Sequence, residues 1–170
     1  MRAAPRVLIA YAGKRGTTER AAHFLASCFE NASVRDLKKT DASPERYDAV
    51  IVGSAVYRGA IEPQARSFLV RYENTLLGVP LGIFLCHAFA DEAPDLFRDN
   101  FPESLLASCV TYDSFGGTYD LSQMGVRERM WMNRHLRARS RQRGSEDLLT
   151  GLSDSSIRAF AERMKRAFEE

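Results

Sequence analysis

Cysteine is scarce in this sequence of 170 residues, and the few cysteines are not arranged in pairs. Cys28, Cys86 and Cys109 are an odd number and form no CxxC motif. Disulfide frameworks and zinc ribbons are built from paired cysteines, so the sequence argues against both kinds of scaffold. We therefore expect no metal site, and we expect a reducing, cytoplasmic environment.

Long hydrophobic runs are also missing. The apolar run Val7–Ala12 is too short for a secretion signal or a membrane span, and the cations Lys14 and Arg15 follow it closely. Hydrophobic residues make up 45% of the chain and charged residues 27%, unlike disordered, collagenous or membrane-embedded chains. We expect one domain over residues 1–170, which begins to fold near its first residue.

The net charge is only +2, but positive charge is concentrated in one segment. Between Gly125 and Arg143 the only acidic residue is Glu128. The same stretch contains Arg127, Arg129, Arg134, Arg137, Arg139, Arg141 and Arg143. This local excess indicates that an anionic partner meets this basic segment, at about 120–145.

Four short apolar runs have the pattern of strands that are buried on both faces of a sheet. They are Val7–Tyr11, Ala49–Gly53, Leu81–Cys86 and Ser108–Tyr112, and Val34–Leu37 fits a brief edge strand. None of the four shows the alternation of a half-exposed strand, which favours a parallel sheet covered by helices.

Helical periodicity fills the intervals between these strands. Ser153 or Asp154 can cap a last helix at the C-terminus. The apolar faces are formed by Ala21, Phe24, Leu25, Cys28 and Phe29; by Ala65, Phe68, Leu69 and Tyr72; by Leu96, Phe97 and Phe101; and by Ile157, Phe160, Ala161, Met164 and Phe168. The alternation predicts an α/β fold, a three-layer doubly wound five-stranded parallel sheet.

In such sheets ligands bind beyond the carboxyl ends of the strands, so the loops there are candidate binding segments. The loop after the first strand opens into a helix and consists of Gly13, Lys14, Arg15, Gly16, Thr17 and Thr18. It matches neither a Walker loop nor a GxGxxG turn. Two interpretations stay open: a phosphate bound at the helix N-terminus, or a Thr17 helix cap beside solvated turn charges.

The later loops place aromatic residues beside small ones. Tyr57 follows the third strand, where either a flat apolar ligand or the start of the next helix packs against it. His87 and Phe89 follow the fourth strand, and His87 fits a hydrogen-bonded loop residue better than a catalyst. The loop Ser114–Tyr119, after the fifth strand, again combines small and aromatic residues.

Together these segments resemble the flavodoxin-like FMN-binding family over essentially the whole chain. The likeness rests on Val7–Tyr11 before the glycine loop, on Tyr47–Ser54 followed by Tyr57–Gly59, and on Phe115–Gly117 before an extra helical segment. It is strongest for the flavodoxin-domain branch that includes the bacterial menaquinone-dependent protoporphyrinogen oxidase. The resemblance implies a flavodoxin-like domain with strand order 2-1-3-4-5 and FMN as its cofactor.

The resemblance also implies which residues bind FMN: the first loop holds the phosphate, and the loops after the third and fourth strands enclose the isoalloxazine. Carried over by position, the contacts are Gly13, Lys14, Arg15, Gly16, Thr17, Thr18, Ala55, Val56, Tyr57, Arg58, Gly59, His87, Ala88, Phe89, Asp91, Gly116 and Gly117. FAD is not expected, because no second glycine-rich turn is available for an AMP half. No catalytic side chain is assigned, since the flavin performs the redox step.

Two features depart from the family pattern. Ala12 stands where the family usually has Ser or Thr, which removes a hydroxyl donor worth about 0.5–1.5 kcal/mol. The chain is mildly basic, whereas electron-shuttling flavodoxins are strongly acidic, so a docking partner of different charge is expected.

Three interpretations of the basic segment stay open. Met124, Met130 and Trp131 interleave with its arginines. The segment is a surface helix with Trp131 packed on the body, an amphipathic helix on an anionic membrane or over the flavin edge, or a nucleic-acid contact. The surface helix is favoured, and nucleic acid is the least supported. The membrane interpretation implies contact through Arg127–Arg143 at the inner face of the membrane.

The functional hypothesis is an FMN-dependent oxidoreductase that transfers electrons between a planar organic substrate, porphyrinogen- or quinone-like, and an acceptor. A non-catalytic flavodoxin-type carrier that meets a redox protein stays open as an alternative. So does a flavin-free flavodoxin-like interaction domain. A phosphoacceptor receiver domain is excluded, because Gly53 and Ser54 stand where its aspartate would follow the third strand.

Overall fold

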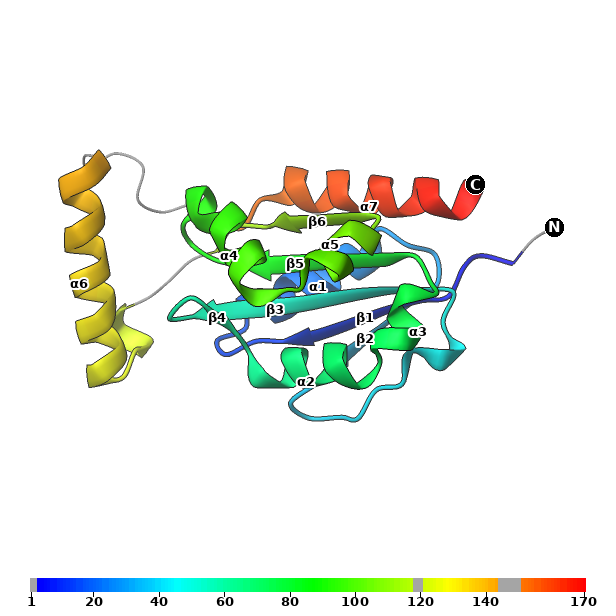
Figure 1. The fold of residues 1–170 in the computed structure, drawn as a ribbon, viewed down its shortest axis with the longest axis horizontal. Coiled ribbons are helices and arrows are strands. Elements are labelled where there is room, and N and C mark those ends of the chain that lie inside the picture. Colours follow the sequence, from blue (N-terminus) through cyan, green and yellow to red (C-terminus); the bar gives the residue numbers. More distant parts are fainter. Residues whose placement is uncertain (1–2, 118–120, 144–150) are drawn as a thin grey trace.

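The computed structural model describes residues 3–117, 121–143 and 151–170. Its centre is a sheet of five parallel strands (Figure 1), β1 (Val7–Ala12), β2 (Ala32–Asp36), β3 (Ala49–Tyr57), β5 (Leu81–Cys86) and β6 (Thr111–Ser114). They lie in the order β2-β1-β3-β5-β6, and the two-residue strand β4 (Ala60–Ile61) pairs antiparallel with the end of β3. The predicted order of the parallel strands is therefore confirmed.

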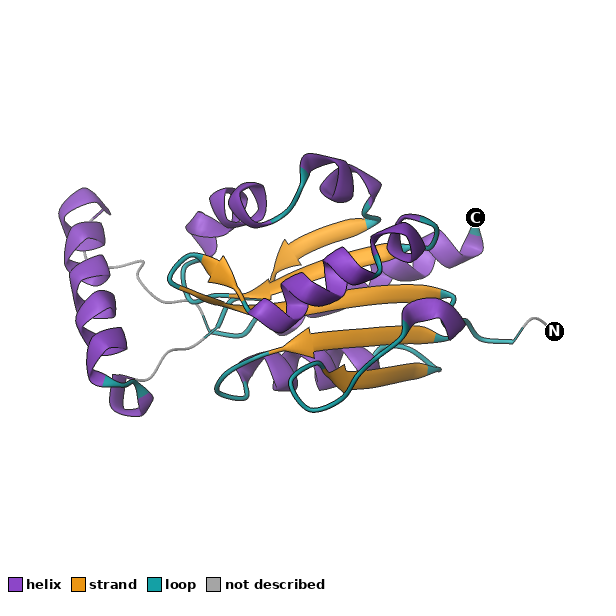
Figure 2. Ribbon diagram, turned by 60° about the horizontal axis from the view of Figure 1, so that its bottom comes forward, coloured by secondary structure: helices purple, strands orange, loops and turns teal. Residues whose placement is uncertain are grey.

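Helices cover both faces of this sheet (Figure 2). One face carries α1 (Thr17–Ser27) and α7 (Asp154–Glu169), and the other carries α2 (Pro63–Arg71), α3 (Glu73–Leu77), α4 (Ala93–Asn100) and α5 (Glu103–Ser108). Short 3-10 turns occupy Pro44–Arg46, Ala90–Glu92 and Leu121–Gln123. Helix α6 (Val126–Arg143) lies instead across the carboxyl ends of the strands (Figure 1). The doubly wound three-layer fold is confirmed, with α6 as an addition to it.

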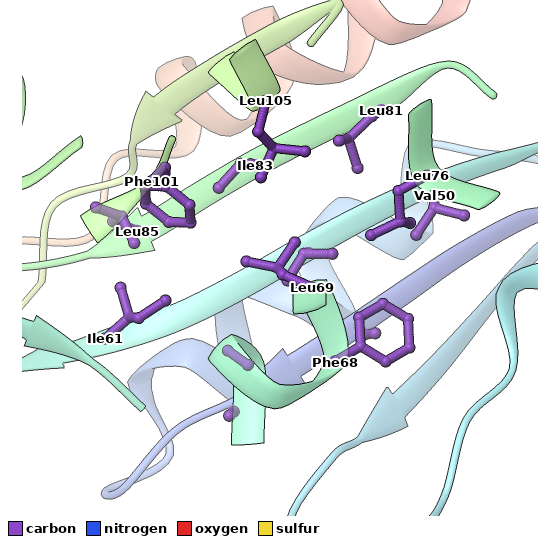
Figure 3. Close-up of a cluster of buried hydrophobic side chains, with 14 of the residues drawn as sticks. Val50, Ile61, Phe68, Leu69, Leu76, Leu81, Ile83, Leu85, Phe101 and Leu105 are labelled. Atoms are coloured by element: carbon purple, nitrogen blue, oxygen red, sulfur yellow. The ribbon is translucent and has the colours of Figure 1, made fainter. Parts of the chain in front are cut away.

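The core consists of two apolar clusters, one on each face of the sheet. Successive residues of β1 alternate between them, so Leu8 and Ala10 join one cluster while Val7 and Ile9 join the other. Figure 3 shows the cluster beneath α2 to α5, where Leu69 lies among side chains of the central strands. Burying each large apolar side chain contributes about 1.5–3 kcal/mol, so the uninterrupted apolar runs stabilise both layers.

The last predicted strand was misplaced. Ser108–Tyr112 was expected to be extended, but Ser108 ends α5 and the strand β6 begins at Thr111. The helix forms because Leu105 is buried against the sheet, and its burial outweighs the β-propensity of the residues that follow. Strand β3 is longer than expected and continues past Gly53 to Tyr57.

The C-terminal helix follows the sequence closely. The Ser153 hydroxyl accepts a hydrogen bond from the Ser156 N–H at 3.2 Å, which caps α7 as expected. Four apolar residues of its predicted face are fully buried, namely Ile157, Phe160, Ala161 and Met164. The cap and the apolar stripe therefore fix both the start of α7 and the face that it turns to the sheet.

The three cysteines are free, and Cys86 is the buried one. Across the described parts of the chain, no cluster of histidine, cysteine, aspartate and glutamate could hold a metal ion. None of the helices in those parts is long and apolar enough to cross a membrane.

Candidate functional site

A cavity of about 100 Å³ lies between the loops that follow β1, β3 and β5 and the inner face of α6. Twelve of the residues predicted for the site line it, namely Lys14, Arg15, Thr17, Thr18, Ala55, Val56, Tyr57, Arg58, His87, Ala88, Phe89 and Gly117. The topology brings them together because parallel strands end at the same edge of the sheet. Figure 1 shows α6 at that edge.

Five predicted residues lie near the cavity without lining it. Gly13 and Gly16 line a neighbouring hollow beside the first loop, and Gly59 lies in the turn after β3. The Gly116 carbonyl accepts a hydrogen bond from the His87 N–H at 3.1 Å, and Asp91 pairs with a residue of α6. Two further residues of the fifth loop, Thr118 and Tyr119, lie outside the described residues.

The first loop has the backbone of an anion-binding turn. Gly16 is the N-cap of α1 and has a φ of 87°, which favours glycine. No side chain caps this helix, so the Thr17 cap interpretation was wrong, and the first N–H groups of α1 remain available to an anion. Gly13 is also required, because a Cβ there would lie 2.9 Å from the Cβ of Thr18.

Ala12, which departs from the family pattern, does not line the cavity. It is fully buried at the end of β1 and belongs to the apolar cluster beneath α2 to α5. Its neighbour across the sheet, Ser54, uses its hydroxyl within the protein, donating to the Ala55 carbonyl and accepting from the Glu62 N–H. The hydroxyl that Ala12 lacks is therefore not replaced by Ser54.

The cations of the first loop face a carboxylate from α6. Arg15 donates from both guanidinium ends to Glu128, one hydrogen bond being 2.8 Å long, and the Lys14 ammonium lies 3.6 Å from the same carboxylate. Glu128 is 8% exposed. The hydrogen bond from Arg15 lowers the pKa of Glu128 below its ordinary value, so the carboxylate is ionised at neutral pH.

A tight hairpin holds Tyr57 at the rim of the cavity. Tyr57 pairs with Ala60, and the two residues between them, Arg58 and Gly59, have φ values of 52° and 78°. Two positive φ values are typical of a type I′ turn, whose twist matches that of the paired strands. The ammonium of Lys14 lies 4.0 Å from the centroid of the Tyr57 ring, within cation–π range.

Planar side chains line the opposite end. His87 lies against Phe89, with ring centroids 5.4 Å apart, and Phe89 lies 5.5 Å from His135 of α6. Trp131 stacks on His135 at 5.0 Å with an angle of 8° between the rings, and Trp131 also lines the cavity. Burial lowers the pKa of His87 and keeps its ring neutral, although Glu92, 3.6 Å away, opposes the shift.

Helix α6 is attached to the loop after β5 as well as to the first loop. Arg139 donates to Asp91 at 2.7 Å and to Glu92 at 2.5 Å, and its guanidinium lies 4.4 Å from the Phe89 ring centroid. His135 lies 2.8 Å from Glu92. Ion pairs thus hold α6 near both of its ends.

The arginines of the basic segment do not all face outward, as the membrane interpretation assumed. Arg139 points toward the body, and its side chain is only 11% exposed. A different face of α6 is exposed and carries Arg127, Met130, Arg134, Arg137 and Arg141. The side chain of Arg143 lies outside the described residues.

Six cavity residues were not predicted as site residues: Glu62, Cys86, Met124, Glu128, Trp131 and Met132. Four of them belong to α6 or to the segment that leads into it, and no local sequence pattern predicts where α6 lies. Glu128 did carry a signal, as the only acid among seven arginines. Burial raises the pKa of the Cys86 thiol to about 12, so this residue is a neutral wall group.

The two ends of the cavity have complementary chemistry. Lys14, Arg15 and the N-terminus of α1 suit an anion, while Tyr57 and Phe89 suit a flat apolar group. The arrangement therefore fits a molecule that joins a phosphate-like anion to a planar ring system.

Comparisons with known proteins found one family model and several solved structures that are similar to this chain. A family model described as "Flavodoxin domain" matches residues 8–144. No curated protein sequence matches the chain. A short-chain flavodoxin associated with a non-canonical PDU bacterial microcompartment is similar in structure, with 14% identity, a TM-score of 0.57, and coverage of 95% of this chain and 97% of that chain.

Two further solved structures share the fold. A flavoprotein in complex with FMN from Lactobacillus acidophilus has 14% identity, a TM-score of 0.51, and coverage of 65% of this chain and 93% of that chain. The flavodiiron protein from Giardia intestinalis has 14% identity and a TM-score of 0.50 over 96% of this chain. This chain spans only 37% of that flavodiiron protein.

Proposed function

This chain belongs to the flavodoxin-domain family, and from that membership we propose that it is an FMN-dependent oxidoreductase acting on a planar organic substrate, porphyrinogen- or quinone-like. The observation that carries the proposal is the cavity, in which an anion-binding end and an aromatic end meet beneath α6. We also propose that residues 1–170 form a single domain of this family.

The residues of the cavity fit FMN by their chemistry. Two cations, Lys14 and Arg15, and the hydroxyls of Thr17 and Thr18 match one phosphate group. Tyr57 offers an aromatic face to the ring system. The loop provides one phosphate-sized turn, which supports FMN rather than FAD.

Bound FMN would supply the electron-transfer chemistry, in one- or two-electron steps. The protein's own residues orient and enclose it. The loop cations neutralise the phosphate, the hairpin at Tyr57 fixes one side of the ring site, and the His87–Phe89 segment fixes the other. Trp131 and Met132 on α6 exclude water from the opening.

The position of α6 favours an enzyme over an electron carrier. A carrier must offer the edge of its flavin to a partner protein, whereas here Trp131 and Met132 line the site from outside the flavodoxin-like body. A small planar molecule held between α6 and the flavin is the better match. We propose the same substrate class from the resemblance of the sequence motifs to the protoporphyrinogen oxidase branch.

Cofactor identity tests the first part of the proposal. We expect the purified protein to show the visible absorbance of an oxidised flavin and to release FMN, identified by mass spectrometry. Tyr57→Ala should weaken FMN binding by about 0.5–1.5 kcal/mol beyond the lost contact area. Tyr112→Ala is the control, because Tyr112 is 46% exposed and does not line the cavity. Release of FAD, or no binding of added FMN, would refute the assignment.

Reaction with a quinone tests the second part. After reduction under anaerobic conditions, the protein should be reoxidised by a water-soluble naphthoquinone at a rate that saturates with quinone concentration. Trp131→Ala should raise the concentration needed for half-saturation, because the ring lines the cavity. A rate that rises linearly with quinone and does not respond to this substitution would support the carrier instead.

A second proposal concerns location: we propose that the exposed face of α6 contacts anionic membrane lipids. Each arginine near such a surface contributes about 1 kcal/mol, and the attraction fades within about 8 Å at physiological salt. The double variant Arg134→Glu/Arg137→Glu should lose sedimentation with anionic vesicles at low salt. Arg46→Glu, an exposed arginine far along the chain from α6, is the control. Equal binding of the native protein to neutral vesicles would contradict the proposal.

A further inference from the structure

One carboxylate contacts both cations of the first loop. Glu128 accepts two hydrogen bonds from Arg15 and lies 3.6 Å from the ammonium of Lys14. These are the cations that the proposed function assigns to the phosphate of FMN, and the inference below rests on that assignment. The same positive charges therefore have two candidate anionic partners, one inside the protein and one on the cofactor.

Both partners cannot use Arg15 fully at once. A guanidinium presents its hydrogen-bond donors in a fixed planar fork, and Glu128 takes both ends of that fork. A phosphate that approached with Glu128 in place would also meet a nearly buried negative charge at close range, which is unfavourable. Breaking the contact between Glu128 and Arg15 would free two of the five guanidinium donors and remove that repulsion, so direct binding of the phosphate is favoured when Glu128 moves away.

The contact between Glu128 and Arg15 can be broken without disturbing the core. Helix α6, which carries Glu128, contributes to neither apolar cluster among the described residues.

We propose that Glu128 is an internal competitor for the phosphate and so determines how strongly the site prefers a phosphorylated flavin. Because Glu128 pairs with Arg15, only a fraction of the molecules is ready to bind the phosphate. The apparent affinity for FMN is the intrinsic affinity multiplied by that fraction. The attachment of Arg139 to Asp91 and Glu92 keeps α6 near the site, so Glu128 can return when the cofactor leaves.

Binding of two flavins to the native protein and to Glu128→Gln tests this role. The protein is stripped of flavin, its fold is checked by circular dichroism, and FMN and riboflavin are titrated by fluorescence quenching. Riboflavin has the same ring system without the phosphate. We expect Glu128→Gln to bind FMN about tenfold more tightly and riboflavin with unchanged affinity. Glu128→Ala should behave in the same way. Glu103→Gln is the control for lost charge, because Glu103 is exposed and does not line the cavity.

The outcomes separate this inference from the proposed function. Weaker or unchanged FMN binding by both Glu128 variants would overturn the competition and make Glu128 a support for Arg15. An equal gain for riboflavin would also overturn it, since the substitution would then act by general opening of the cavity. If the native protein and all variants fail to bind FMN, the proposed function itself fails, and the competition fails with it.

Discussion

The attachment of α6 near its C-terminal end depends on Arg139, and we expect Arg139→Ala to release that part of the helix without unfolding the body. Arg139 makes hydrogen bonds of 2.5 and 2.7 Å to Glu92 and Asp91 and lies over the Phe89 ring. Because α6 lies outside both apolar clusters in the described parts of the chain, the sheet and its covering helices should stay folded when this part of the helix opens.

The magnitude follows from the contacts. A charge-assisted hydrogen bond contributes about 1.5–3 kcal/mol, and a cation–π contact about 0.5–1 kcal/mol. Solvent reaches the carboxylates, whose side chains are 33% exposed in Asp91 and 23% in Glu92, so we expect a total of about 2–3 kcal/mol rather than the full sum. This corresponds to an increase of roughly 30- to 150-fold in the equilibrium constant for opening of the helix.

Hydrogen exchange at the amides of α6 measures that opening directly. In Arg139→Ala these amides should exchange roughly 30- to 150-fold faster, and the free energy of unfolding should fall by no more than the same amount, about 2–3 kcal/mol. Arg141→Ala is the matched control, since Arg141 is an exposed arginine of the same helix. Equal exchange in the two variants would refute the role of Arg139. A fall in the free energy of unfolding well above about 3 kcal/mol in Arg139→Ala alone would show that α6 is part of the core.

Three further predictions follow from the backbone and the buried groups. Gly53→Ala should lower the free energy of unfolding by about 2–3 kcal/mol in a urea titration, because its Cβ would lie 2.1 Å from the fully buried Phe84 ring. Arg58→Asn should raise it by about 0.5–1 kcal/mol, since asparagine tolerates the φ of 52° better. Stability should fall as the pH drops below 6.5, the ordinary histidine pKa, because the unfolded chain then binds a proton that folded His87 resists. His87→Gln should reduce that dependence, and an unchanged pH profile would contradict it.

The strands and covering helices could be predicted because their signals are local. The apolar run of β1 is buried on both faces, and Ile157 and Phe160 of α7 repeat at helical spacing. Where a local signal competed with burial, the prediction failed, as at Ser108, which ends α5 rather than beginning a strand. The hairpin at Arg58 was also missed, because arginine is an unusual residue for a positive φ.

The candidate site was predicted on its sheet side and missed on its α6 side, for a physical reason. Loops after parallel strands must meet at one edge, so the positions of Lys14, Tyr57 and His87 follow from the topology. The partners of Arg15 and Glu92 come from 113 and 47 residues away in the chain, through ion pairs with Glu128 and Arg139. Composition reveals that such charges exist, but only the folded chain shows which of them meet.

The placement of α6 outside both apolar clusters also bears on how this protein can change over generations. Most substitutions destabilise a protein, and natural proteins lie only a little above the stability that they need. Residues of α6 such as Trp131 and Met132 line the cavity but belong to neither described cluster. Replacing them therefore changes the site at little cost to the stability of the protein. New ligand preferences are therefore accessible through mutation of this helix, for natural selection and for laboratory evolution alike.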